Sequence, residues 1–307
     1  ENVNYISCYG DEDLALPYVA SLYDDQLDGL PNYDTCLFLG SNQNYWDISN
    51  LSLYNGTNGT GTQYVVKFYS DASTNRMIGN HLHDCIINGS NPSNWSINSR
   101  SGLSGINIEG WIDGITIENN QVSNVKTNGI GVNGWRAGCN YKGEVNNDSA
   151  KGVVVRGNSL YNIGKDGILP NNCNQPLVEY NVCGKAHSYA TNTAHVAMWP
   201  FASYGALFQY NEAYDTKTIY DGQGFDCDYQ CYYTTFQYNY SHDNVGGFML
   251  VCTEAKNWDG GYSFNKGSTV RYNISQADKH YTFNFTDAIE DTRIYNNTIY
   301  ASRTFKK

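Results

Sequence analysis

The sequence predicts an all-β chain, a right-handed parallel β-helix in which short coils stack into a solenoid. The first observation is a repeated phrase, because LFQYNEAYD at residues 207–215 returns as TFQYNYSHD at residues 235–243. The second is the character of the repeated strands, which are short, rich in β-branched and aromatic residues, and bounded by Gly, Asn and Asp. Units of about 25 to 35 residues cannot bury their own apolar faces, so they are expected to stack.

One asparagine recurs in the repeated phrase. We expect it at a tight bend, where Asn tolerates the left-handed backbone and where its amide can bond to the amides of the coils on either side. The spacing between successive copies varies from 23 residues (158 to 181) to 40 residues (80 to 120), so loops of different length are expected to form the walls of a groove. The aligned residues are Asn80, Asn120, Asn158, Asn181, Asn211, Asn239, Asn273 and Asn296.

The chain divides into two parts. Residues 1–62 carry the repeat weakly and are expected to form an N-terminal cap and early strands, with a short helix within residues 11–26. Residues 63–307 are expected to form one continuous β-helix. The last strand phrase has no amphipathic helix after it to cover the final coil, so we expect a fragment of a longer protein, end-to-end self-association, or another chain covering that coil.

Composition limits the partners. The formal net charge of −11 argues against nucleic acid and against an anionic membrane. No apolar run approaches the ~20 residues needed to span a bilayer. N-glycosylation sequons are numerous, and residues 51–62 (LSLYNGTNGTGT) look like an exposed, glycosylated loop of a secreted, extracellular protein. Among the nine cysteines, Cys227 and Cys231 are near enough to form a disulfide, whereas Cys227 and Cys252 also suit small apolar core positions.

The Gly-led strands that follow the asparagine turns carry the candidate chemistry. Strand alternation directs Phe225 inward and Asp226 and Asp228 outward, with Cα atoms about 7 Å apart. Aligning Phe225 with Phe248 places Met249 and Val251 on the same face as the two acids.

Other polar and aromatic residues are expected near the acids, as candidates for binding the substrate. Trp199 lies one coil before them, His195 starts the strand that holds Trp199, and Asn284 lies two coils after them. Glu254 leaves the next strand, and Trp258 follows in a loop that can form a stacking wall.

Paired carboxylates with an aromatic platform fit glycosidic cleavage, which uses one carboxylic acid and one carboxylate base or nucleophile ~5 to 9.5 Å apart. Like charges nearby raise the pKa of one carboxyl and so separate the two roles. The candidate catalytic pairs are Asp226 with Asp228, or either with Glu254. Alternatively, the acids are merely solvated, or the Asp-x-Asp pattern holds Ca²⁺. Asp221 follows the turn phrase and is expected to be a turn residue.

The motif set resembles the pectin-lyase-like superfamily of parallel β-helix proteins, which are secreted and carbohydrate-active. This resemblance implies a polysaccharide partner, and likeness to the polygalacturonase-like hydrolases implies that Asp226 and Asp228 lie on the strand face where acids act. The segments that carry it are QYNEAYDTK, DGQGFDCD, FQYNYSHDNVGGFMLVC, VRYNISQAD and IYNNTIY.

We therefore predict a secreted glycoside hydrolase that acts on a polysaccharide with paired carboxylates and without a cofactor. One alternative is a non-catalytic extracellular protein that forms fibres or binds glycans. Another is a polysaccharide lyase that uses Ca²⁺ at the acids and a Lys or Arg base.

Overall fold

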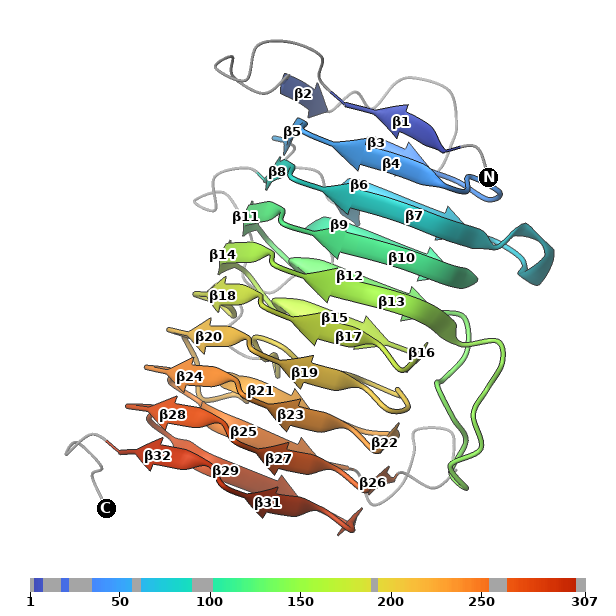
Figure 1. Cartoon of the computed structure of the whole chain (residues 1–307). Helices are drawn as coiled ribbons and strands as arrows, with labels where there is room; N and C mark the ends of the chain where they lie inside the picture. Colours follow the sequence, from blue (N-terminus) through green and yellow to red (C-terminus); the bar gives the residue numbers. More distant parts are fainter. Residues whose placement is uncertain are drawn as a thin grey trace.

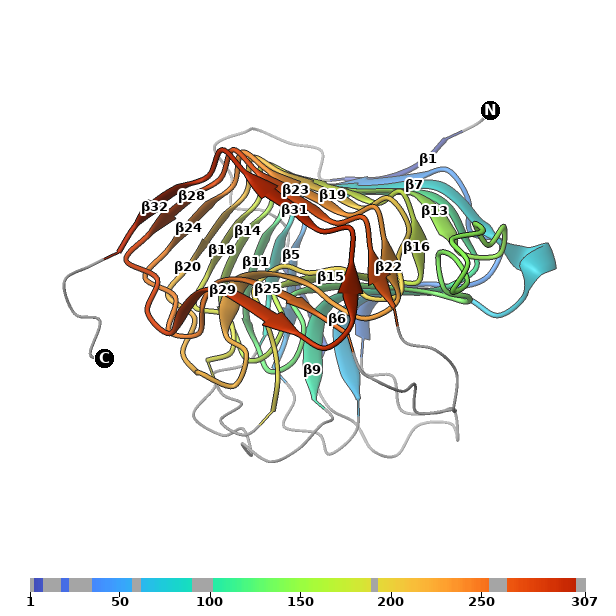
Figure 2. The same ribbon diagram turned by 90° about the horizontal axis from the view of Figure 1, so that it is seen from below.

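The computed structural model describes residues 3–7, 18–21, 35–56, 62–89, 102–188, 193–253 and 264–301. Successive coils each contribute a strand to the same faces, and every pairing between named strands is parallel (Figure 1). Viewed along the stack, the strands of each face superpose and enclose a single interior (Figure 2). The predicted all-β parallel β-helix is confirmed. No helix within these ranges is long and apolar enough to cross a membrane.

The first sheet runs the length of the stack. In the described ranges it has 11 strands, and β16 pairs with β13 beside the main path. Its strands are β1 (Asn4–Ile6), β4 (Trp46–Ser49), β7 (Met77–His83), β10 (Ile112–Glu118), β13 (Ala150–Arg156), β16 (Cys173–Asn174), β17 (Leu177–Glu179), β19 (Leu207–Gln209), β23 (Thr235–Gln237), β27 (Thr269–Arg271) and β31 (Arg293–Tyr295).

The second sheet follows the first after each asparagine turn. It includes a strand at Tyr18–Ser21, which pairs with β5 (Ser52–Asn55). The short helix expected here is wrong for these residues, because strand pairing with the next coil overrides the local helix preference. Its strands are β2 (Tyr18–Ser21), β5 (Ser52–Asn55), β8 (Ile86–Asn88), β11 (Gln121–Val125), β14 (Ser159–Ile163), β18 (Val182–Gly184), β20 (Glu212–Tyr214), β24 (Tyr240–His242), β28 (Ile274–Gln276) and β32 (Thr298–Tyr300).

The third face carries the candidate site. It consists of a five-stranded and a three-stranded sheet, joined by single bridges from Ile168 to Met198 and from Met198 to Phe225. Its strands are β3 (Thr35–Leu39), β6 (Gln63–Ser70), β9 (Leu103–Gly110), β12 (Ile130–Gly134), β15 (Ile168–Asn171), β21 (Gln223–Cys227), β25 (Gly247–Cys252) and β29 (Tyr281–Thr286). The remaining elements are β22 (Cys231–Tyr232), β26 (Asn265–Lys266), β30 (Ile289–Glu290) and the 3-10 turn η1 (Ser73–Asn75).

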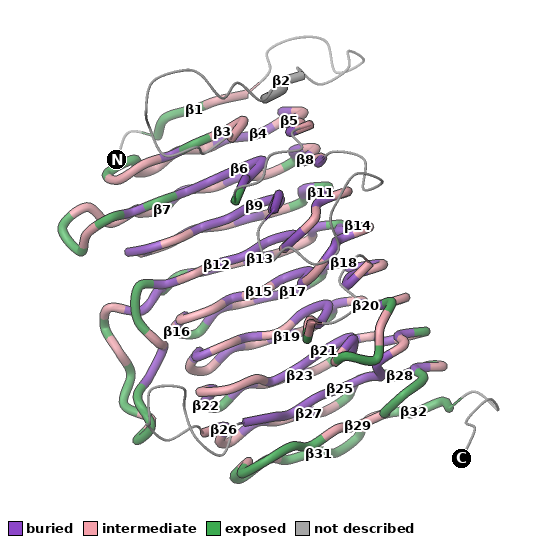
Figure 3. Tube along the Cα trace, turned by 180° about the vertical axis from the view of Figure 1, so that it is seen from behind, coloured by how far each residue is buried: buried purple, intermediate pink, exposed green. Residues whose placement is uncertain are grey.

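Apolar residues from all three faces form the core, and buried positions recur on successive coils of the stack (Figure 3). In the C-terminal half the core is aromatic: the rings of Phe208 and Phe236 stack at 4.8 Å, and the ring of Phe225 lies 6.0 Å from that of Phe236. In the final coil, Phe285 and Ile299 are exposed.

A buried asparagine ladder joins the first sheet to the second. Each side-chain amide donates to the Oδ1 of the next asparagine at 2.9 to 3.0 Å, and that oxygen also accepts the backbone N–H of the preceding asparagine. The predicted amide ladder is therefore confirmed. Its members are Asn120, Asn158, Asn181, Asn211, Asn239, Asn273 and Asn297.

Three details of the asparagine prediction are wrong. The left-handed residue is the one before the asparagine, such as Tyr210 with φ 56° and Tyr238 with φ 57°, because the asparagine itself must turn inward to bond. The last member is Asn297, and Asn296 is its left-handed neighbour. Asn80 lies outside the ladder and instead accepts the backbone N–H of Trp46.

The expected exposed loop at residues 51–62 is only partly described. Ser52–Asn55 forms β5, and the side chain of Asn55 is fully buried and donates to the Tyr64 carbonyl oxygen. A glycan cannot be attached at Asn55 in this fold, because its amide nitrogen faces the interior. Cys227 and Cys231 are free thiols, so the disulfide reading is wrong for this pair.

Candidate active site

Asp226 and Asp228 lie on the same side of β21. Phe225 and Cys227 alternate with them and are fully buried in the core. The Cys252 thiol lies 3.8 Å from Asp226 Oδ1 and donates to Asp228 Oδ1 at 3.2 Å. One oxygen of each carboxylate and the sulfur lie within 4.8 Å of one another. The prediction that these two carboxylates share one face is confirmed.

The strand beside these acids is shifted by one residue from the predicted register. Phe225 pairs with Met249 and not with Phe248, so Met249 and Val251 belong to the core, and Cys252 turns to the acids. The core position expected for Cys252 and the outward positions expected for Met249 and Val251 are therefore wrong. A one-residue slip moves every side chain to the opposite face of a strand.

The cause of the shift is a pair of consecutive inward residues at the start of each strand. A Cβ on Gly224 would lie 2.7 Å from Ser241 Oγ and 3.3 Å from Ala213 Cβ, so this position faces the interior just as Phe225 does. Phe248 and Met249 are likewise both fully buried. The strict alternation of inward and outward side chains begins only after these two inward residues.

Burial governs the protonation of the two acids. Asp226 is only 2% exposed, and burial, reinforced by Asp228 and Asp221, raises its pKa well above the usual value. Burial also raises the pKa of Asp228 to about 7, with Asp221 and Asp166 adding to the rise, although bonds from Cys252 and from the Tyr229 N–H oppose it. Asp228 is therefore a carboxylic acid that changes charge near neutral pH.

His195 and Trp199 are joined to the site through Asp166, which sequence reasoning missed. Asp166 Oδ2 lies 2.9 Å from His195 Nδ1, and Asp166 Oδ1 accepts Trp199 Nε1–H at 2.9 Å. Burial favours the neutral form of Asp166, but the charge on His195 and these hydrogen bonds outweigh it and lower the pKa. Trp199 lies beside Asp226 on the neighbouring coil, since Met198 pairs with Phe225.

Asp221 is a fourth carboxyl group of the site. It pairs with His195 along the backbone, and the Gly222 N–H donates to the His195 carbonyl oxygen at 2.9 Å. Burial raises its pKa, with Asp166 adding to the rise and His195 opposing it. Its left-handed backbone, with φ 55°, fits the predicted turn role, yet the same residue also lies close enough to influence the charges of Asp226 and Asp228.

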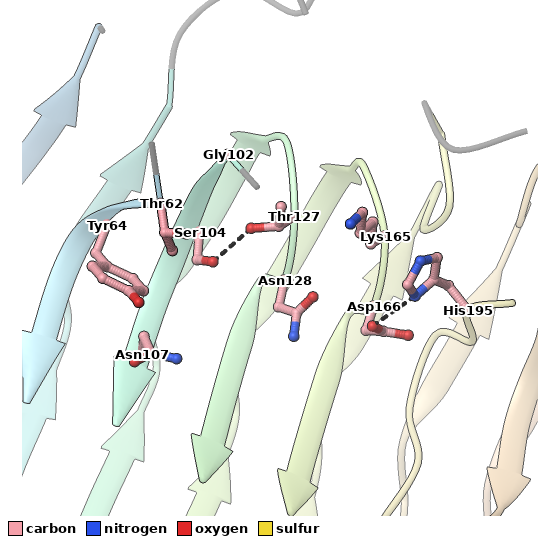
Figure 4. Close-up of a pocket in the computed structure, with 10 residues that line it drawn as sticks. All are labelled: Thr62, Tyr64, Gly102, Ser104, Asn107, Thr127, Asn128, Lys165, Asp166 and His195. Atoms are coloured by element: carbon pink, nitrogen blue, oxygen red, sulfur yellow. Dashed lines mark hydrogen bonds and ion pairs between the residues drawn. The ribbon is translucent and has the colours of Figure 1, made fainter. Parts of the chain in front are cut away.

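Asp166, Asp221, Asp226 and Asp228 together form the acidic cluster of the third face. A polar pocket of about 290 Å³ opens on the same face and reaches this cluster at Asp166 and His195 (Figure 4). Asp226 and Asp228 lie outside its lining. The His195 Nε2 atom is buried and has no hydrogen-bond partner among the described residues. The pocket is lined by Thr62, Tyr64, Gly102, Ser104, Asn107, Thr127, Asn128, Lys165, Asp166 and His195.

The other predicted site residues have separate outcomes. Asn284 pairs with Leu250, which pairs with Asp226, so it lies two coils after the acid as predicted. Glu254 and Trp258 lie outside the described residues. The two carboxylates and thiol of Asp226, Asp228 and Cys252 differ from the all-oxygen set that Ca²⁺ takes, so these three side chains do not by themselves form a calcium site.

Comparison with known proteins agrees with the fold and points to a carbohydrate-active relative. No protein-family model matches the chain. Over 215 residues, 61% of this chain, it is 33% identical to a lacto-N-biosidase from Bifidobacterium longum subsp. longum, and it spans 13% of that protein's length. The crystal structure of a GH136 lacto-N-biosidase from Eubacterium ramulus superposes on 97% of this chain and 58% of its own, with a TM-score of 0.57 and 18% identity, and the native crystal gives 0.56. The chain therefore has the parallel β-helix fold of the GH136 lacto-N-biosidase structure.

Proposed function

We propose that this chain belongs to a glycoside hydrolase that cleaves an oligosaccharide at the acidic cluster of the third face. The observation that carries the proposal is the raised pKa of Asp228, about 7, close to a polar pocket. Three further carboxyl groups, those of Asp166, Asp221 and Asp226, lie near it. The identity of 33% with a lacto-N-biosidase supports the same class of reaction. The chain spans only 13% of that relative's length, so the hydrolase activity of this chain is itself part of the proposal.

We assign the general acid to Asp228, because its pKa of about 7 keeps it protonated below neutral pH and because it is less deeply buried than Asp226. The second carboxylate in this proposal is Asp221, which is partly exposed; burial raises its pKa, and the neighbouring His195 opposes that rise and favours the ionised form. Asp226 is too buried to meet a substrate, and its raised pKa favours the protonated form, so its role is to keep a neutral carboxyl group beside Asp228.

The pocket would hold the sugar. Its volume of about 290 Å³ lies near the lower end for small-molecule sites, ~300 Å³. Ser104, Asn107 and Asn128 offer hydroxyl and amide groups for sugar hydroxyls, and the unpaired His195 Nε2 can bond to a further hydroxyl near the cluster. In this arrangement the bond to be cleaved lies between the Asp166 and His195 end of the pocket and the carboxyl groups of Asp221 and Asp228.

The first test is hydrolysis of the 4-nitrophenyl glycoside of lacto-N-biose. We expect the chain to release 4-nitrophenol, and we expect Asp226→Asn to keep kcat/KM within about tenfold of the wild type, because an amide resembles a protonated carboxyl group in size and hydrogen bonding. The absence of release above the uncatalysed rate would contradict the proposed function. Loss of activity in Asp226→Asn with an intact fold would instead return the catalytic pair to Asp226 and Asp228.

The pH profile gives a second test. Asp228 has its pKa raised to about 7, so the proton needed by the leaving group is present below that pH and is lost as the pH rises through it. We expect kcat/KM to fall with increasing pH above about 7, approaching tenfold per pH unit. A profile that stays flat or rises between pH 6 and 9 would rule out Asp228 as the acid.

A further inference from the structure

Three neighbouring strands of the first sheet bring two histidines and two acids together, on a different face from the proposed hydrolase site. β7 lies between β4 and β10, where Asp47 pairs with His81 and Glu118 pairs with His83. Ile48, Leu82 and Ile117 are fully buried, so their polar neighbours in the three strands project outward. These four side chains are between 21% and 32% exposed and are reachable from solvent.

The side chains converge at short distances. The rings of His81 and His83 stack at 4.2 Å. His83 Nε2 lies 2.8 Å from Asp47 Oδ1, and His81 Nε2 lies 3.1 Å from Glu118 Oε2. One ligand atom each from Asp47, His81 and His83 lies within 4.8 Å of the others. Ligands of one zinc ion, at bond lengths of ~2.0 to 2.2 Å, are about 3.5 Å apart, so side-chain shifts of about 1 Å complete the geometry.

The second nitrogen of His83 is also held. His83 Nδ1 lies 2.6 Å from Asp84 Oδ2, and in the tautomer whose Nδ1–H donates to Asp84 the lone pair is on Nε2. That lone pair faces an oxygen of Asp47, an arrangement that needs a cation between the two atoms, either a second proton or a metal ion. A carboxylate on the far nitrogen is the usual way in which a metal-binding histidine is oriented.

We propose that Asp47, His81 and His83 form a binding site for a divalent transition-metal ion of the zinc class. Glu118 stands beside His81 to serve as a fourth ligand or to hold a bound water, and Asp84 is a positioning residue. Two imidazole nitrogens with a carboxylate suit zinc, nickel or copper, whereas Ca²⁺ and Mg²⁺ prefer oxygen ligands. Together with Glu118 the site joins three consecutive coils of the stack, and the proposal does not depend on the hydrolase activity.

The chain offers a matched control in His242. Its Nδ1 lies 2.9 Å from Asp243 Oδ2 and its Nε2 lies 3.0 Å from Glu212 Oε1, so it has carboxylates on both nitrogens as His83 has. Its stacking neighbours, however, are the rings of Tyr214 and Tyr240 rather than a second imidazole. If a histidine with a carboxylate on each ring nitrogen were sufficient to bind the metal, His242 would bind it too.

The experiment is a calorimetric titration of the chelator-treated chain with zinc chloride. We expect one equivalent of zinc to bind to the wild type, and His81→Ala and His83→Ala each to weaken the affinity at least tenfold. Asp84→Asn should weaken it about tenfold, because loss of the partner of a metal-binding histidine has effects of that size. His242→Ala should bind as the wild type does, and so should Cys252→Ser, which alters the Asp226, Asp228 and Cys252 cluster.

Several outcomes would overturn the proposal. They are no zinc binding by the wild type, unchanged affinity in either His81→Ala or His83→Ala, or loss of binding in Cys252→Ser. Tighter binding of Ca²⁺ than of zinc would overturn it as well. The substituted histidines and Asp84 are at least partly exposed, so the unfolding temperatures of these variants measured in chelator should match the wild type; if an alanine variant unfolds early, His81→Gln and His83→Gln replace it in the titration.

Discussion

Replacing Asp228 or Asp221 with asparagine should lower kcat/KM by about 10² to 10⁴-fold, the range that general acid–base groups contribute. Asparagine keeps the size of the aspartate side chain but cannot give up or take a proton. In Asp228→Asn the leaving group loses its acid, and in Asp221→Asn the ionised partner is lost. The measurement is the rate of 4-nitrophenol release at pH 6, where Asp228 is protonated in the wild type.

The two variants should differ on a substrate that needs no acid. A 2,4-dinitrophenyl leaving group departs without protonation, so Asp228→Asn should recover much of its activity with it, and Asp221→Asn should not. Asp226→Asn is the matched control, since it changes a neighbouring carboxyl group that we assign no proton transfer. Equal losses in all three variants would show that the substitutions damage the cluster as a whole and would contradict the separate roles.

The fold was predictable because each coil repeats a local pattern. A strand, an asparagine turn and a second strand are encoded within about ten residues, as in residues 207–215, and stacking follows from the apolar faces of those strands. The asparagine ladder was predictable for the same reason, since an amide repeated at one corner bonds to its own copies. The left-handed residue was misassigned to the asparagine because tyrosine is an unusual residue at such a backbone angle.

The candidate site was only partly predictable. Alternation along one strand was enough to place Asp226 and Asp228 on the same face, because the relation is local. The neighbouring strand was misplaced by one residue because the consecutive inward pair at Phe248 and Met249 breaks the alternation, and sequence pattern alone does not reveal it. The contribution of Asp166 was missed because it reaches Trp199 from a coil 33 residues earlier.

The asparagine ladder should also contribute to stability. Asn211 is buried, accepts the N–H groups of Asn181 at 3.0 Å, and donates to the Val178 carbonyl oxygen and to Asn239. In Asn211→Ala these partners remain buried without it, and each unsatisfied group costs about 1 to 3 kcal/mol. We therefore expect the free energy of unfolding to fall by about 3 kcal/mol or more, which corresponds to a decrease in Tm of about 5 °C or more in a thermal scan.

Asn297→Ala supplies the matched control, because Asn297 is the same residue at the last step of the described ladder. It accepts from Asn273 and donates to the Val270 carbonyl oxygen, but it is only half-buried, so water can replace part of what the amide provides. Asn297→Ala should lower the free energy of unfolding by about 1 kcal/mol. If the two variants lowered Tm equally, burial of the amide would not be what makes the ladder stabilising, and each asparagine would contribute only through the turn that it follows.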